Sequence, residues 1–425
     1  MKVVFNKKSP YTLLYKAKGS YPHMKYVIIL GDGMADYPIE KLGGKTPLAV
    51  AHKPMMDALA QKGEVGLVKT VPEGFAPGSD VANLGVLGYD ANLSYTGRSP
   101  LEALSMGVEL EEDDIALRTN LVTLSNDEPF ECKKMVDYSA GEIPTEDSAI
   151  LMKEIDSQLG TDTLKFYPGV SYRHLLVIKG AGKDAIKDLT LVPPHNILDK
   201  DVKSNMPKGK IGALLSSLII KSNEVLKNHE INQKRTLSGK NNANNIWFWG
   251  EGTTPCLEPF EEKYGVKGAI ISAVDLLKGI AKGSKMYAPK VDGATGLLNT
   301  NYKGKADTAI KLLEEYDFVF VHLEAPDECG HQGDLEGKIK AIELIDEKIL
   351  TPIFKALDGK EDFRIMVLPD HRTPIAVRTH TSEPVPYFIY DSRVRKTGCK
   401  YDEITAESTD IYIDTPWQLT RKFFS

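Results

Sequence analysis

Cysteine is scarce in this sequence, with four residues among 425. Cys132, Cys256, Cys329 and Cys399 form no Cys-x-x-Cys pair, which argues against a zinc ribbon and against a disulfide scaffold. We therefore expect reduced thiols and a cytoplasmic location. Cys329 lies in a polar motif, but a metal requires the thiolate, so we interpret it as a packed side chain, with soft metal ligation as the less favoured alternative.

Long hydrophobic runs and an excess of basic charge are also missing. The first residues, MKVVFNKKSPYTLLYKAKGS, are interrupted by lysines, so we expect neither a signal peptide nor a membrane span there. The formal net charge is -6, whereas nonspecific nucleic-acid binding requires a basic surface. We expect a small-molecule substrate and neither a nucleic-acid nor a membrane partner.

Three common nucleotide and hydrolase motifs are absent or incomplete. The stretch Gly31-Asp-Gly33-Met-Ala-Asp36 begins like a dinucleotide fingerprint, but Asp36 occupies the third glycine position and would repel a pyrophosphate. Neither a P-loop nor a G-x-S-x-G elbow occurs in the sequence. NAD binding and an α/β-hydrolase mechanism are therefore disfavoured.

Continuous apolar segments alternate with helical patterns along much of the chain. This alternation predicts an α/β fold with an open, largely parallel central sheet. The predicted strands are 26–30, 318–323 and 365–368, and the predicted helices are 54–63, 306–315 and 335–350.

The middle of the chain has a different character. Residues 119–239 are polar and rich in lysine, and they lack strands that end in acids. A chain of 425 residues also exceeds what one hydrophobic core usually serves. We predict an α+β lobe at 119–239, inserted into a discontinuous core formed by 1–118 and 240–425.

Each predicted strand of the core is followed by an acid. In open parallel sheets, ligands bind outside the carboxyl ends of the strands, so these side chains should meet. A single such Asp often only caps a helix or closes a turn. Three acids close together would repel one another, however, and a cation would offset that repulsion. The candidate ligands are the three acids and three nearby histidines, namely Asp32, Asp327, His331, Asp370, His371 and His380.

These side-chain types indicate which ions would bind. Mixed imidazole and carboxylate ligands suit zinc, manganese or iron better than calcium. Six candidates exceed the three or four ligands of one catalytic zinc, which favours two ions able to clamp a phosphoryl group. Ser79, where a loop gives way to a predicted helix, is then either an N-cap or a metal-activated nucleophile.

An ordered set of motifs resembles one known family over nearly the whole chain. They include YVIILGDGMAD, GSDVANLGVLGYD, TGRSPLEA, PGVSYRHLLV, VPPHNIL, EAPDECGHQGDLEGKIKAIE, LPDHRTP and RTHTSEPVPY. They are similar to those of the cofactor-independent phosphoglycerate mutases of the archaeal type, which belong to the alkaline phosphatase superfamily. The resemblance implies an alkaline-phosphatase-like core and interconversion of 3-phosphoglycerate and 2-phosphoglycerate in glycolysis and gluconeogenesis, through a phosphoserine and without 2,3-bisphosphoglycerate.

The resemblance also implies roles for individual residues. One divalent ion would be held by Asp32, Ser79, Asp370 and His371, and the other by Asp327, His331 and His380. Manganese is the expected metal, with zinc, cobalt or magnesium as alternatives. The expected substrate-binding residues are Asn83 for the phosphoryl oxygens, with Arg98, Arg173, His174 and His195 for the glycerate carboxylate and Arg235 and Lys285 as further candidates.

Two positions and one segment depart from the family pattern. Gly85 stands where the family usually has Ser, and Arg372 stands where it has Pro. The first 23 residues or so have no counterpart in the family. The main alternative function is a metal-dependent phosphomonoesterase or phosphodiesterase of the same superfamily. A phosphopentomutase and a noncatalytic metal-stabilised protein are weaker alternatives, and the oligomeric state is left open.

Overall fold

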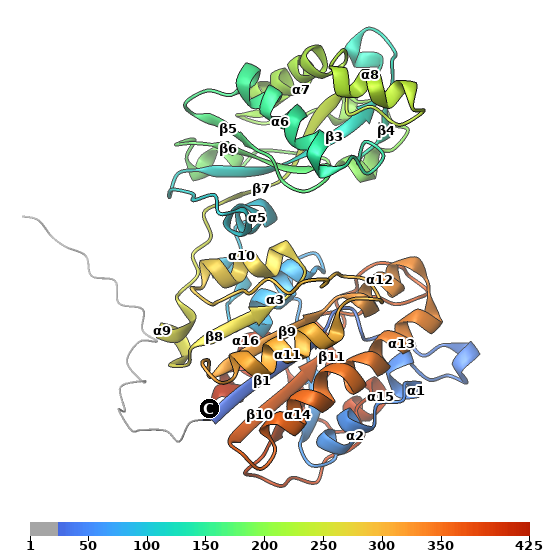
Figure 1. Ribbon diagram of the computed structural model, residues 1–425, viewed down its shortest axis with the longest axis vertical. Coiled ribbons are helices and arrows are strands. Elements are labelled where there is room, and N and C mark those ends of the chain that lie inside the picture. Colours follow the sequence, from blue (N-terminus) through green and yellow to red (C-terminus); the bar gives the residue numbers. More distant parts are fainter. Residues whose placement is uncertain (1–23) are drawn as a thin grey trace, which may run out of the picture.

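A computed structural model describes residues 24–425 and contains two sheets, each with its own helices (Figure 1). The N-terminal stretch, for which we expect no family counterpart, lies outside the described residues. Within them, the larger sheet has seven strands in the order β12-β2-β11-β10-β1-β9-β8. Their bounds are β1 Met24–Gly31, β2 Glu64–Val68, β8 Gly268–Ile271, β9 Phe318–Leu323, β10 Asp362–Leu368, β11 Val385–Asp391 and β12 Tyr412–Ile413.

The larger sheet is mostly parallel, as predicted. Strand β1 pairs in parallel with both β10 and β9, and β8 continues the parallel order, whereas β11 runs antiparallel to its neighbours. Central parallel strands are covered on both faces, which is why β1 reads as a continuous apolar run. Val27 and Ile29 belong to one core cluster, while Ile28 and Leu30 belong to another.

Helices cover both faces of this sheet (Figure 1). One face packs against α2 Pro54–Ala60, α11 Tyr302–Leu312, α13 Leu335–Ile345 and α14 Thr351–Leu357, and the other against α3 Ser79–Val86, α10 Asp275–Gly283 and α16 Pro416–Phe424. The remaining helices of the core are α1 Pro47–Val50, α4 Ala91–Ser94, α9 Phe260–Tyr264, α12 Ala325–Gln332 and α15 Glu403–Glu407.

All three helices predicted for the core exist, and only their bounds differ. The predicted 335–350 helix begins as α13 and continues through a π-helical turn at Asp346–Leu350. That turn places Asp346 under α2, where its carboxylate accepts the Met56 N–H at 2.6 Å. The wider turn thus lets one long helical segment cap the start of its neighbour.

The second sheet forms a separate lobe above the core (Figure 1). It is antiparallel, and its strands are β3 Ile115–Leu124, β4 Met135–Asp137, β5 Leu164–Tyr167, β6 Arg173–Ile178 and β7 Asn245–Thr253. Helices α6 Thr145–Leu159, α7 Gly212–Leu226 and α8 Glu230–Leu237 belong to the same lobe. Its apolar side chains form their own core cluster, so the lobe has an α+β architecture.

The lobe sheet includes residues on both sides of the predicted domain limits. Strand β3 begins before residue 119, and β7 lies wholly after residue 239. The division of the chain into domains stays a prediction, and we propose to place its limits near residues 114 and 254 instead.

Helix α5, Arg98–Met106, lies between the core and the lobe together with α10 (Figure 1). Its Glu102 Oε1 accepts from Arg98 Nε at 3.0 Å and lies 3.2 Å from Arg118 Nη1 on β3. A carboxylate between two guanidinium groups therefore ties α5 to the lobe sheet.

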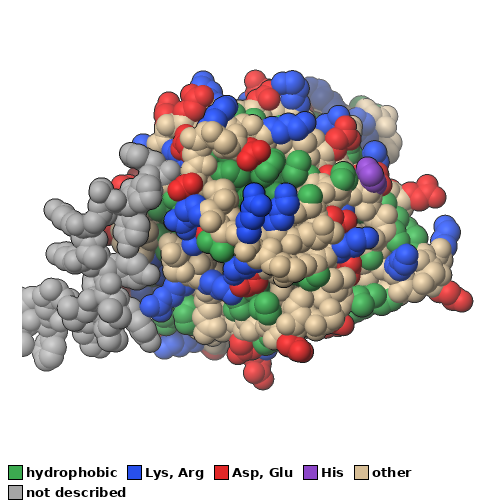
Figure 2. Space-filling model, turned by 90° about the horizontal axis from the view of Figure 1, so that it is seen from below, with side chains coloured by type: hydrophobic (Ala, Val, Ile, Leu, Met, Phe, Trp, Pro, Cys, Tyr) green, Lys and Arg blue, Asp and Glu red, His purple; other side chains and the backbone are tan. Residues whose placement is uncertain are grey.

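The face of the core remote from the lobe has an ordinary polar surface. Lys and Arg side chains lie across the middle of this face, and hydrophobic side chains appear in small separate groups (Figure 2). Such scattered groups are normal on a folded protein. In the part of the chain that the structure describes, no helix combines the length and the apolar composition needed to cross a bilayer.

Candidate active site

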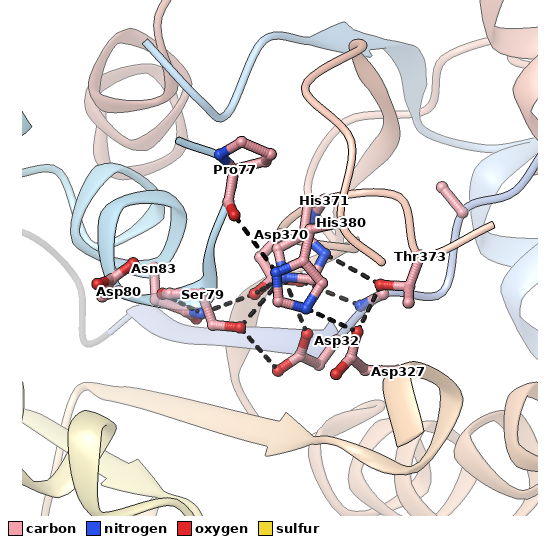
Figure 3. A network of polar contacts seen from close by, with 12 residues as sticks. Asp32, Pro77, Ser79, Asp80, Asn83, Asp327, Asp370, His371, Thr373 and His380 are labelled. Atoms are coloured by element: carbon pink, nitrogen blue, oxygen red, sulfur yellow. Dashed lines mark hydrogen bonds and ion pairs between the residues drawn. The ribbon is translucent and has the colours of Figure 1, made fainter. Parts of the chain in front are cut away.

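The three predicted acids meet at the carboxyl ends of adjacent strands (Figure 3). Asp32 follows β1 directly, Asp327 lies in the first turn of α12 after β9, and Asp370 follows β10. His371 Nε2 lies 3.5 Å from Asp32 Oδ1 and 3.5 Å from Asp370 Oδ2. All four side chains are buried, so this is a dense cluster of charge in a low-dielectric site.

His331 and His380 complete a second group around Asp327. The Nε2 atom of His331 lies 3.2 Å from Asp327 Oδ2, and that of His380 lies 3.4 Å from Asp327 Oδ1. The two Nε2 atoms are 3.0 Å apart. The ring of His380 stacks on that of His371, with centroids 3.9 Å apart, so the two groups adjoin.

The three histidines share one orientation. Nδ1 of His331 lies 3.0 Å from the Arg378 carbonyl, and Nδ1 of His380 lies 3.4 Å from the Pro77 carbonyl. Nδ1 of His371 faces the Thr373 hydroxyl at 3.2 Å. A histidine that ligates a metal donates its other N–H to such an oxygen, which leaves Nε2 free as a ligand.

The side chains fit divalent metal binding. Asp327, His371 and His380 can offer ligand atoms within 4.8 Å of one another, and so can Asp32, Asp370 and His371. In addition, Asp32 Oδ1 is buried and has no hydrogen-bond partner among the described residues. A buried carboxylate oxygen without a donor is costly, and a cation would satisfy it. His371 belongs to both sets, so it lies at their junction.

The electrostatics of the two groups differ. Burial, with repulsion from Asp370 and Asp327, raises the pKa of Asp32 well above its ordinary value. Burial acts the same way on Asp327, but hydrogen bonds from His331 and His380 outweigh it and hold the Asp327 pKa well below its usual range. The hydrogen bond with Asp327 in turn raises the pKa of His331 to about 9. The Asp32 group therefore has unbalanced negative charge, whereas Asp327 already has cationic partners.

Ser79 points into the Asp32 group. Its Oγ lies 3.1 Å from His371 Nε2 and donates to Asp32 Oδ2 at 3.4 Å (Figure 3). The residue is the first of α3, as predicted, but Gly78 occupies the N-cap position, and among the described residues the Ser79 hydroxyl contacts Asp32 and His371 but no backbone N–H of the helix. The N-cap interpretation of Ser79 is therefore wrong, and its hydroxyl is left to the acidic cluster.

The turn interpretation is partly right for Asp370. Its Oδ1 accepts the backbone N–H groups of Gly33 at 3.1 Å and His371 at 3.0 Å, while Oδ2 faces the site and accepts from Asn83 Nδ2 at 2.9 Å. The Asp370 carboxylate thus binds the backbone with Oδ1 and directs Oδ2 into the site.

A cavity of about 810 Å³ opens above Ser79 and Asp32 and reaches the lobe. Its core side includes His322, Glu324 and His380, and its lobe side includes His195, Trp249 and Glu251. The volume is that of an ordinary small-molecule site.

The predicted substrate-binding residues fall into different surroundings. Arg98 and His195 line the cavity. Asn83 is buried under it and donates to the Ser79 carbonyl at 2.8 Å as well as to Asp370. Arg173 is exposed at the start of β6, and its neighbour His174 is buried in the lobe, with Nδ1 accepting from Gly169 N at 3.0 Å. The further candidates Arg235 and Lys285 are not among the residues that line the cavity.

Several site residues were not predicted from the sequence. His322 is the penultimate residue of the otherwise apolar strand β9, and its Nε2 lies 3.0 Å from Asp32 Oδ2. Thr373 contacts both groups through its hydroxyl. Trp249 and Glu251 lie on β7, which is far in the sequence from any predicted ligand. A histidine within an otherwise apolar strand was the one usable signal among these.

Cys329 is not part of either ligand group. It is buried against α13, and burial together with Asp334 raises the pKa of the thiol to about 11. The group therefore stays protonated, which agrees with the prediction of a packed side chain.

Gly85 and Arg372, the two expected departures from the family pattern, both fit their local packing. A Cβ at Gly85 would collide with the ring of Pro416, because α16 lies against α3. The guanidinium group of Arg372 donates to the carbonyls of Pro384, at 2.9 and 3.2 Å, and of Asp36, at 3.2 Å. Arg372 thus anchors the loop that carries His380.

Known proteins resemble this chain in sequence and in fold. A sequence profile described as 2,3-bisphosphoglycerate-independent phosphoglycerate mutase matches residues 60–232. A protein of that name from Methanosarcina acetivorans is 52% identical over 368 residues, covering 86% of this chain and 90% of the relative. A probable one from Geobacter sulfurreducens is 46% identical over 398 residues, covering 93% of this chain and 98% of the relative.

Two solved structures agree with the architecture. A protein from Pyrococcus horikoshii, 30% identical, superposes with a TM-score of 0.79 and covers 94% of this chain and 97% of its own. A cofactor-independent phosphoglycerate mutase from Thermoplasma acidophilum, 25% identical, superposes with a TM-score of 0.64 and covers 94% of this chain and 98% of its own.

Fold and sequence together define an isomerase built on an α/β core with a second, antiparallel sheet. The chain belongs to the family of 2,3-bisphosphoglycerate-independent phosphoglycerate mutases. The resemblance found in the sequence and the predicted α/β fold class with a largely parallel central sheet are thereby confirmed.

Proposed function

We propose that this chain interconverts 3-phosphoglycerate and 2-phosphoglycerate by passing the phosphoryl group through Ser79, without 2,3-bisphosphoglycerate. Membership of the mutase family supports the substrate. The observation that carries the Ser79 step is the position of its Oγ, 3.1 Å from His371 Nε2 and at the floor of the cavity. A hydroxyl at a helix N-terminus beside such a cluster is suited to receive an anionic group.

Two divalent ions complete the proposed site, with manganese as the expected metal and zinc, cobalt or magnesium as alternatives. Asp32, Ser79, Asp370 and His371 would hold one, and Asp327, His331 and His380 the other. When bound, such ions lower the pKa of a hydroxyl and offset the charge of a phosphoryl group. Asp32 Oδ1, which has no hydrogen-bond partner in the described part of the chain, and the shared orientation of the histidines support this assignment.

The proposed reaction consists of two balanced transfers. Ser79 Oγ loses its proton and bonds to phosphorus, the bond from phosphorus to the 3-oxygen breaks, and that oxygen gains a proton. Glycerate then turns within the cavity. Its 2-hydroxyl loses a proton and takes the phosphoryl group, and Ser79 Oγ is protonated again. Water must be excluded between the two steps, because it would compete for the phosphoserine.

The lobe would hold the glycerate carboxylate. Arg98 and His195 are the predicted residues that already line the cavity, and Arg98 is placed by its bond to Glu102. Arg173 and His174 lie farther into the lobe, so their predicted contact with substrate requires the lobe to approach the core. Asn83 would act by fixing Asp370 and the start of α3.

The test uses metal-stripped protein and 3-phosphoglycerate, without 2,3-bisphosphoglycerate, before and after manganese is restored. Phosphorus NMR of quenched samples, from which a chelating resin has removed the paramagnetic Mn²⁺, resolves both phosphoglycerates and inorganic phosphate, so no coupling enzyme with its own metal requirement is needed. We expect 2-phosphoglycerate to form only after metal is restored, with little free phosphate. Release of phosphate without 2-phosphoglycerate would contradict the proposed mutase function and favour the phosphomonoesterase alternative. Turnover without added metal would contradict the two-metal site.

A further inference from the structure

The hydroxyl of Thr373 lies between the two candidate ligand groups (Figure 3). It donates a hydrogen bond to Asp327 Oδ1 and lies 3.2 Å from Nδ1 of His371. The side chain is fully buried, and although Thr373 lies within the LPDHRTP motif, the sequence analysis assigned it no role. The Thr373 hydroxyl therefore connects a carboxylate of one group to an imidazole of the other through hydrogen bonds.

The chemistry of its two neighbours allows one arrangement of protons. A ligating Asp327 carboxylate can only accept, so the Thr373 proton must point to Oδ1. A ligating His371 presents Nε2 to the site, so Nδ1 carries the proton and needs an acceptor, which the Thr373 oxygen supplies. A hydroxyl is the one small uncharged side-chain group that can donate and accept at the same time in this way.

The other two histidines do not depend on a side chain for this purpose. His331 and His380 direct Nδ1 at backbone carbonyls, those of Arg378 and Pro77. A backbone carbonyl survives any substitution, whereas the partner of His371 is removed by a single change at Thr373. His371 is also the residue common to both ligand groups.

The surrounding chain is shaped to hold this hydroxyl in place. Gly33 and Gly330 lie against Thr373, and a Cβ on Gly33 would come within 2.6 Å of Asp327 Oδ1 while one on Gly330 would come within 2.8 Å of Thr373 Cγ2. The buried ammonium of Lys338 donates to the Thr373 carbonyl at 2.8 Å and pairs with Asp36 at 2.8 Å. These contacts restrict both the backbone and the side chain of Thr373.

We propose that Thr373 is a positioning residue that orders both metal-ligand groups at once, and so couples the affinity of one ion to that of the other. The inference rests on the proposed two-metal site. Partners that orient a ligand typically change metal affinity by about 10- to 100-fold when they are removed. Because the hydroxyl serves a ligand on each side, its loss should weaken both ions rather than one.

The experiment compares Thr373→Val, which removes the hydroxyl at nearly constant volume, with Thr373→Ser, which keeps it. Calorimetric titration of metal-free protein with Mn²⁺ alone gives the number of ions and both affinities. We expect about 10- to 100-fold weaker binding of both ions for Val and near-normal binding for Ser. Thr70→Val is the matched control, because Thr70 is buried and its hydroxyl has no hydrogen-bond partner among residues 24–425.

The outcomes separate this inference from the proposed function. Wild-type protein that fails to bind two ions overturns the two-metal site and the inference together. Wild-type binding of two ions, with Val affinities within about 2-fold of wild type, overturns the role of Thr373 alone, and so does weakening of only one ion. Thermal unfolding of the metal-free variants checks the fold. Should Val unfold, Thr373→Ala, which adds no atom against Gly33 or Gly330, answers the same question.

Discussion

Ser79 begins α3, yet its side chain takes no part in capping that helix. We expect Ser79→Ala to lower mutase turnover by on the order of a thousand-fold or more, as loss of a nucleophile does in other enzymes. The free energy of unfolding should change by no more than about 0.5 kcal/mol, because no cap hydrogen bond is lost. Turnover by phosphorus NMR and urea unfolding measure the two quantities.

Asp90→Ala is the matched control for Ser79. Asp90 does cap its helix, since its Oδ1 accepts the Asn92 N–H at 3.0 Å, and it is not among the residues that line the cavity. This variant should lose about 1 kcal/mol of stability and keep its turnover. Normal turnover of Ser79→Ala would remove Ser79 as the phosphoryl carrier, whatever the stabilities.

His331 is the most exposed of the three histidines, with 36% of its side chain accessible. We expect His331→Ala to remain folded, to bind a single Mn²⁺ ion where the wild type binds a pair, and to lose mutase activity. The physical reason is that its Nε2 is one of only three predicted ligands of the Asp327 ion. Mn²⁺ titration with circular dichroism tests this, with exposed His52→Ala as the control. If His331→Ala bound as many Mn²⁺ ions as the wild type, His331 would not be a metal ligand.

Sequence patterns found the acids and histidines at this scale because strand ends concentrate them. Asp32 and Asp370 each follow an apolar run that can be recognised without a structure. Thr373 could not be found in this way, since a threonine two residues past a histidine is unremarkable until the fold brings Asp327 against it. Roles that depend on a contact across 46 positions of sequence are invisible to a local pattern.

At the scale of elements, β6 carries a buried histidine whose environment disfavours its charged form. Burial, with Arg118 and Arg173 nearby, lowers the pKa of His174 from 6.5 to about 3. Between these values the unfolded chain binds one more proton than the folded chain, so stability is fully present above pH 6.5 and falls as the pH is lowered toward 3. From pH 6.5 to 5 the His174 contribution should fall by roughly 2 kcal/mol.

His174→Asn isolates this contribution, because Asn offers an acceptor near the position of Nδ1 but cannot be protonated in this range. Urea unfolding at several pH values should show that the wild type loses more stability on acidification than the variant does. His322, which is also buried, is present in both proteins and cancels in the difference. Equal pH dependence of the two proteins would mean that His174 does not stay neutral in the folded lobe.

The element pattern was predictable where strands are buried on both faces, and less so in the lobe. Strands β1, β9 and β10 read as continuous apolar runs, which fixed their positions closely. Strand β3 is equally buried, but Arg118, Thr119 and Asn120 lie within it, so polar composition concealed it. Their partners, among them Glu102 on α5 and Trp249 on β7, come from distant parts of the chain.

At the scale of the whole molecule, the cavity is made by two bodies, and each supplies what the other lacks. The core contributes the acids, imidazoles and Ser79, whereas the lobe contributes His195 and the Trp249 indole. Trp249 is held firmly, since Nε1 donates to Asn120 at 3.0 Å and its ring lies 4.7 Å from the Arg118 guanidinium carbon. A rigid aromatic wall opposite Ser79 is suited to keep water away from a phosphoserine.

We therefore expect Trp249→Ala to raise the share of turnovers that end in inorganic phosphate, by on the order of tenfold, the effect of about 1.4 kcal/mol on the competing steps. The physical reason is that loss of the indole lets water enter between the two transfers. Phosphorus NMR of one reaction mixture gives the ratio of phosphate to 2-phosphoglycerate directly. Trp417→Ala, on α16 and away from the cavity, is the matched control. Slower mutase turnover of Trp249→Ala without added phosphate would mean that the lobe wall holds glycerate but does not exclude water.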